Sequence, residues 1–83
     1  PAVSQEREPI VDIFDEKDRV IVIAELAGVN EKDILVETKG NELTISAGSA
    51  VRKYSKTVKL PFNIKTKLKQ RYKNGILELV FEK

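Results

Sequence analysis

The chain has 83 residues, which is enough for one domain with a modest core. It contains no cysteine and no histidine, which excludes disulfide bridges, thiol chemistry and the commonest general base and metal ligand. The net charge of +2 conceals an asymmetry, because residues 1–50 carry 5 Lys/Arg against 11 Asp/Glu and residues 51–83 carry 10 against 2.

Short strand-like runs separated by turn residues follow one another along the chain. Residues 1–8 are expected to be a flexible N-terminal remnant, and residues 9–83 are expected to form one domain. The first predicted strand, residues 9–14, opens with proline, which suits an edge strand because proline donates no hydrogen bond to a neighbour. Further strands are predicted over residues 19–26, 34–38, 42–47 and 51–60, with a short link over residues 48–50.

The last two strands carry the clearest hairpin signal. Asn74-Gly75 stands between two alternating runs, and both residues tolerate the positive φ angles of a type I′ turn. The rows predicted to face inward are Leu68, Gln70 and Tyr72 before the turn, and Leu77, Leu79 and Phe81 after it. Strands of this length without a long helical period predict an all-β fold, an immunoglobulin-like β-sandwich of about seven to eight antiparallel strands.

Five short motifs occur in an order that is typical of one protein family. They are Asp12-Ile13, Glu25-Leu26-Ala27-Gly28-Val29 followed by Asp33-Ile34, Leu43-Thr44-Ile45-Ser46-Ala47, Leu60-Pro61 and Asn74-Gly75-Ile76-Leu77. Over residues 9–82 the chain resembles the α-crystallin domain of small heat shock proteins, in the archaeal and bacterial type. The resemblance implies an ATP-independent holdase that binds partially unfolded client proteins and assembles into homo-oligomers.

The resemblance also implies a docking groove for a tail of a neighbouring chain. In this family an Ile-x-Ile motif binds between two strand edges, which here would be residues 34–38 and 68–72. The implied groove residues are Val22, Ala24, Ile34, Val36, Leu68 and Gln70. Gln70 stands where the family usually has alanine, so we expect a more polar lip.

Three further departures from the family pattern affect the expected mode of dimerisation and the bend after the second strand. Residues 48–51 are too short for the loop that archaeal and bacterial members exchange between partners, so a strand-swapped dimer is not expected. Dimers would instead form by self-pairing of the long strand through Arg52, Tyr54, Lys56 and Val58, and the isolated domain is expected to be a monomer or a weak dimer. Lys56 replaces a frequent arginine, and Ala27 replaces a frequent proline, which should loosen the bend after the second strand.

A second interaction surface is predicted on the outside of the sandwich. Ile21 and Ile23 alternate with the inward row of their strand, so they should lie on the outer face. Val80 and Ile13 are expected to join them. A contiguous apolar patch on a small domain usually marks an interaction site, and we expect it to hold a client or the N-terminal arm.

A CS-type co-chaperone or scaffold domain that binds a defined folded partner is the alternative, and the missing exchange loop favours it. Catalysis and cofactors are not expected, because the chain has no nucleophile–base pair and Asp12, Asp15 and Asp18 fit a solvated turn. No nucleic-acid or membrane partner is expected, because the tyrosines of the basic half face inward and no apolar run approaches roughly 18 residues. A cytoplasmic location is expected because no secretory leader is present.

Overall fold

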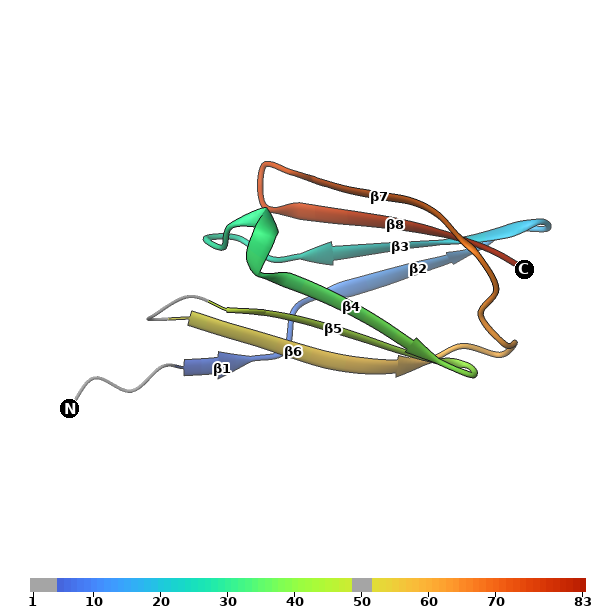
Figure 1. Cartoon of the computed structure of the whole chain (residues 1–83), viewed down its shortest axis with the longest axis horizontal. Helices are drawn as coiled ribbons and strands as arrows, with labels where there is room; N and C mark the ends of the chain where they lie inside the picture. The colour runs from blue at the N-terminus through green and yellow to red at the C-terminus, as the bar shows by residue number, and fades with distance from the viewer. Residues whose placement is uncertain (1–4, 49–51) are drawn as a thin grey trace.

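Eight β-strands build this computed structural model, which describes residues 5–48 and 52–83. In chain order they are β1 (Gln5–Arg7), β2 (Val11–Asp15), β3 (Arg19–Glu25), β4 (Ile34–Lys39), β5 (Glu42–Gly48), β6 (Arg52–Lys59), β7 (Lys67–Lys73) and β8 (Ile76–Glu82), with a short 3-10 turn, η1 (Glu31–Asp33), before β4. Two stacked sheets result, with the strand orders β1-β6-β5-β4 and β2-β3-β8-β7 (Figure 1). All neighbouring strands are antiparallel except β1, which runs parallel to β6.

The predicted all-β sandwich is confirmed, and the seven predicted strands agree with β2 to β8 to within a few residues. One expectation about the N-terminus was wrong, because residues 5–7 form β1 and pair with the start of β6. Residues 49–51, which the sequence assigned to the link and to the start of the long strand, lie outside the described residues, as do residues 1–4.

The core lies between the two sheets and follows directly from the alternation in the central strands. Neighbouring residues of β3, β5 and β8 point in opposite directions, and the inward rows are almost fully buried. These rows are Val20, Val22 and Ala24 on β3, Leu43, Ile45 and Ala47 on β5, and Leu77, Leu79 and Phe81 on β8. The inward direction predicted for the β8 row is therefore confirmed.

The β7–β8 turn is built as the sequence predicted, and its glycine has a second role. Asn74 and Gly75 have φ angles of 53° and 79°, as a type I′ turn requires. A Cβ atom on Gly75 would lie 3.2 Å from the Cα atom of Ala27, and the Gly75 carbonyl accepts a 2.8 Å hydrogen bond from the Leu26 N–H group. The turn therefore packs directly against the backbone that follows β3.

Gly75→Ala is expected to lower the free energy of unfolding by about 1–2 kcal/mol, because alanine disfavours this φ angle and its Cβ crowds Ala27. Urea unfolding measures the loss. Gly40→Ala is the matched control, since Gly40 also has a positive φ of 61° but its nearest neighbour to a Cβ is 4.0 Å away. Equal losses in the two variants would show that the contact with Ala27 contributes nothing.

Two tyrosines, one from each sheet, hold the loop that follows β3. The Tyr54 hydroxyl on β6 donates to the Ala27 carbonyl at 2.9 Å. The Tyr72 hydroxyl on β7 lies 2.7 Å from the Leu26 carbonyl and 3.1 Å from the Val29 carbonyl. The bend at Ala27, where the family usually has proline, is thus contacted by hydroxyl groups from both sheets.

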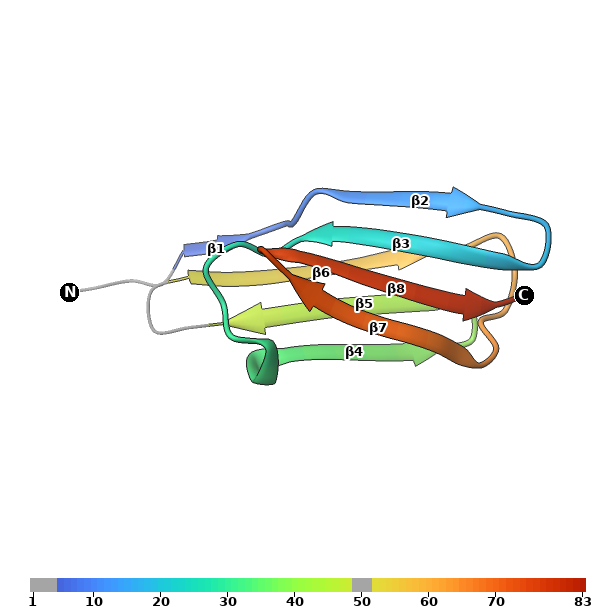
Figure 2. The same ribbon diagram turned by 90° about the horizontal axis from the view of Figure 1, so that it is seen from above.

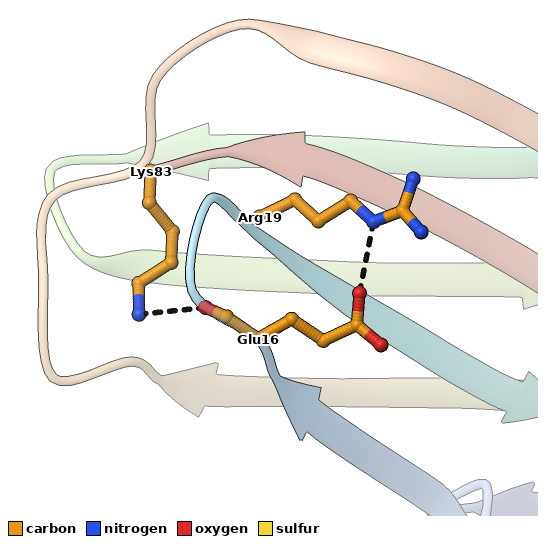
Figure 3. A network of polar contacts seen from close by, with 3 residues as sticks. All are labelled: Glu16, Arg19 and Lys83. Atoms are coloured by element: carbon orange, nitrogen blue, oxygen red, sulfur yellow. Dashed lines mark hydrogen bonds and ion pairs between the residues drawn. The ribbon is translucent and has the colours of Figure 1, made fainter.

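At the opposite end of the sandwich, a polar network joins the β2–β3 turn to the end of β8 (Figure 3). Arg19 Nε donates to Glu16 Oε1 at 2.9 Å, and this hydrogen bond, together with the charge of Glu16, raises the pKa of Arg19. Lys83 donates to the Glu16 carbonyl oxygen at 3.0 Å and forms an ion pair with Asp15. All four side chains are partly or largely exposed, so each contact stabilises the fold only slightly.

Candidate functional site

One long side of the sandwich is bordered by β4 from one sheet and β7 from the other (Figure 2). Both are the outermost strands of their sheets, so one side of each backbone pairs with no described strand. Such edges leave inward-facing side chains partly covered and backbone hydrogen-bonding groups free to pair. The tail-docking groove implied by the family resemblance is expected on this side.

On β4 the structure places the two predicted aliphatic residues as expected. Ile34 lies opposite Ala47 and Val36 lies opposite Ile45, so both share the inward face of the sheet. Both are half-buried and pack against the core. Leu35, between them, points to the outer face and is exposed.

On β7 the predicted row is broken at its start. A bulge between Lys67 and Lys69 inserts one residue against β8, which shifts the alternation. Leu68, the extra residue, is 56% exposed and lines a surface hollow with Arg19 and Glu82, which belong to the outer row. The prediction that Leu68 faces inward was therefore wrong.

Beyond the bulge, the β7 row faces inward as predicted. Gln70 lies opposite Leu79, and Tyr72 lies opposite Leu77. Gln70 is exposed, and its side-chain oxygen accepts a hydrogen bond from Lys67, which gives this strand a polar rim. Tyr72 is half-buried and packs against the core.

The predicted floor of the groove was also wrong. Val22 and Ala24 are 0% exposed and lie on β3, which β8 separates from β7. No tail can reach them without opening the core. We give the name β4–β7 edge to four inward-facing residues of the two outermost strands, which are Ile34 and Val36 on β4 and Gln70 and Tyr72 on β7. Tyr72 was missed as a lining residue, although its place in the inward row of the hairpin already indicated it.

The structure places three of the four predicted patch residues, Ile21, Ile23 and Val80, on the outer face, where Val80 is largely covered. Ile21 lies opposite Val80 on one side and Phe14 on the other, so these three side chains form one row across the outer face. Ile23 is on the same face two residues further. Ile13 was misplaced, because it lies opposite Val22 and so faces the core side, and Phe14 takes its place outside.

The strand predicted for self-pairing is only partly available. β1 pairs with β6 over Arg52, Lys53 and Tyr54, which contradicts a free edge along the whole strand. Lys56 and Val58 lie beyond this pairing and share the inward face with Tyr54. Within the described part of the chain, self-pairing is therefore restricted to residues 55–59.

The described part of the chain has no buried charged side chain and no cluster of three or more potential metal-ligating residues. None of its helices is long and apolar enough to cross a membrane. The described surface presents strand edges that pair with no described strand and several exposed apolar side chains.

Comparisons with known proteins agree with this architecture. The family model described as "HSP20-like domain found in ArsA" matches residues 17–81, which include both strands of the β4–β7 edge. The "Probable 15 kDa heat shock protein" of Leptospira interrogans is 28% identical over 90 residues, which cover 90% of this chain and 69% of the relative.

Solved structures give the same result. Heat shock protein 16.0 from Schizosaccharomyces pombe superposes with a TM-score of 0.81 at 28% identity, over 94% of this chain and 68% of that chain. The hspA protein from Xanthomonas axonopodis gives a TM-score of 0.79 over 98% of this chain and 96% of that chain. At 19% identity, the second likeness concerns the fold alone.

Proposed function

Because the chain belongs to the family of HSP20-like domains found in ArsA, we propose that it is an ATP-independent holdase domain that binds partially unfolded proteins. Its relatives in sequence and in structure are small heat shock proteins, which supports a chaperone role. The proposed activity holds clients without chemical change, so it needs no catalytic residue and no cofactor. We propose that the domain acts in the cytoplasm and forms homo-oligomers in its full-length form.

The observation that carries this proposal is the β4–β7 edge. Ile34 and Val36 are half-buried, share one face and are separated by one residue. The two isoleucines of an Ile-x-Ile segment have the same spacing in an extended strand, so both can face these residues at once. The unpaired sides of β4 and β7 supply the backbone groups that hold an added strand.

The same edge suits an unfolded client for the same physical reason. An unfolded chain exposes extended apolar segments that a folded protein buries, and an edge recognises them mainly through backbone hydrogen bonds. Side-chain selection is then weak, since only Ile34, Val36 and Tyr72 offer apolar contact. We infer that clients are chosen by their exposed extended segments and not by a particular sequence.

A domain that binds one defined folded partner is the second candidate. Two observations favour it: β1 covers the first part of the strand that self-pairing would use, and the family description places such domains in one named protein, ArsA. Such a domain would bind one folded protein at a fixed ratio and leave the aggregation of unrelated clients unchanged.

Light scattering from a heat-unfolded client, without nucleotide, distinguishes the two functions. We expect scattering to fall as the domain is added and to be largely suppressed at a few molar equivalents. Addition of ATP should change nothing. Unchanged scattering at tenfold molar excess, for several unrelated clients, would contradict the holdase proposal and favour the defined partner.

A further inference from the structure

The outer face of the β2-β3-β8-β7 sheet carries an apolar stripe that lies outside the β4–β7 edge. Phe14, Ile21 and Val80 stand side by side on three neighbouring strands. Val80 is only 7% exposed although it is not part of the core cluster, whereas Phe14 is 51% exposed. Neighbouring side chains on the outer face therefore cover Val80, whereas the Phe14 end of the stripe is open to solvent.

Other apolar residues extend this stripe along the strands. Ile76 lies opposite Glu25 and shares its outer row, and Ile23 lies in the row between Ile76 and the stripe. Leu68 reaches the same face at the other end because of the β7 bulge. An apolar surface that continues over several rows of a small domain marks an interaction site more often than scattered aliphatic residues do.

The two edge strands of this face carry opposite charges, although Glu78 of β8 lies between them and forms a 3.0 Å ion pair with Lys69. β7 directs Lys69, Arg71 and Lys73 outward, because they lie opposite the outward residues of β8. At the other edge of the sheet, Asp12 points outward from β2, because it lies opposite Ile23. Asp12 and Arg71 belong to one row that crosses the whole sheet, with Ile23 and Glu78 between them.

We propose that a second copy of this chain packs against this outer face, with a two-fold axis that runs along the strands. Rotation about such an axis exchanges the two edges of the sheet and keeps each row in place. The acidic edge of one copy, at Asp12, then faces the basic edge of its partner, at Arg71, and the apolar stripes meet between them. A two-fold axis across the strands would place β7 over β7 and oppose its basic residues, so the charge pattern selects the first arrangement.

In this arrangement the outer faces of the two copies pack together with their strands aligned, as the two sheets of a β-sandwich do. Because the contact is isologous, each copy contributes both charges, so two ion pairs form at the rim, and Ile21 of each copy meets Val80 of the other in the neighbouring row. Association of this chain with itself is independent of whether it protects clients.

Sedimentation equilibrium of the whole chain, together with charge exchange, tests the proposal. We expect the apparent mass to rise with concentration from 9.4 kDa towards twice that value. Asp12→Arg and Arg71→Asp should each weaken association at least tenfold, and the double variant should restore it to within about threefold. Glu37→Arg makes the same charge change as Asp12→Arg on the other sheet and should leave association unchanged.

Two results would overturn the proposal. One is a wild-type chain that stays at 9.4 kDa at every concentration measured. The other is a double variant that associates no better than its parents. If the wild type stays monomeric but Phe14→Ser reduces protection of a client, the outer face holds clients instead of a second copy. Circular dichroism of each variant excludes loss of the fold as the cause.

Discussion

Val36→Glu is expected to weaken the binding of an Ile-x-Ile peptide at least tenfold. Val36 is half-buried on the inward face of β4, where an isoleucine of the peptide would contact it. A carboxylate at this place would lose water when the peptide binds and find an apolar side chain opposite it, and a tenfold change needs only about 1.4 kcal/mol. Fluorescence anisotropy of a labelled peptide measures the dissociation constant.

The neighbouring residue supplies a matched control. Leu35→Glu introduces the same side chain and the same charge one position earlier, but on the outer face of β4, where Leu35 is already exposed. Its peptide affinity should equal that of the wild type. If both glutamates weaken binding equally, charge repulsion and not the inward face of β4 determines affinity, and the proposed site is wrong.

Tyr72→Phe is expected to lower the free energy of unfolding by about 2–3 kcal/mol. The hydroxyl lies within hydrogen-bonding distance of the Leu26 and Val29 carbonyls, and its removal leaves these acceptors without that donor in a partly buried site. Hydrogen exchange of the loop at residues 26–29 should accelerate as well, because the same contact holds this loop to β7.

Tyr54→Phe is the comparison for this prediction. Among the residues that the structure describes, its hydroxyl donates only to the Ala27 carbonyl, which also accepts from Arg52 Nη1 at 3.4 Å, so one donor remains after the substitution. Urea unfolding of both variants should show the larger loss for Tyr72→Phe. The reverse order would mean that the loop is held mainly from β6.

Local pattern was sufficient to predict most of this fold. Alternation in β5 and β8 defines their buried rows, and Asn74-Gly75 has the positive φ angles of its turn. These features depend on residues close together in sequence, where backbone geometry and side-chain burial are tightly linked. The placement of Ile34 and Val36 followed from the same alternation.

The predictions failed where the pairing of a strand with a distant part of the chain decides where its residues lie. A bulge displaced Leu68, and nothing in the alternating Lys67–Lys73 run indicates an inserted residue. Ile13 changed faces because its register against β3 is fixed by tertiary pairing. Val22 was assigned to the groove although β8 separates its strand from β7, which only the sheet order reveals. β1 was missed because three polar residues carry no hydrophobic period.

The most direct test of the chaperone assignment is a titration of an Ile-x-Ile peptide into the labelled chain, followed by backbone NMR shifts. The proposal predicts saturable shifts at Ile34, Val36, Gln70 and Tyr72, with little change on the outer face at Ile21 and Val80. Saturation of the peptide without shifts on β4 and β7 would contradict the β4–β7 edge as the docking site. The CS-type domain that binds a defined folded partner would then be the better interpretation.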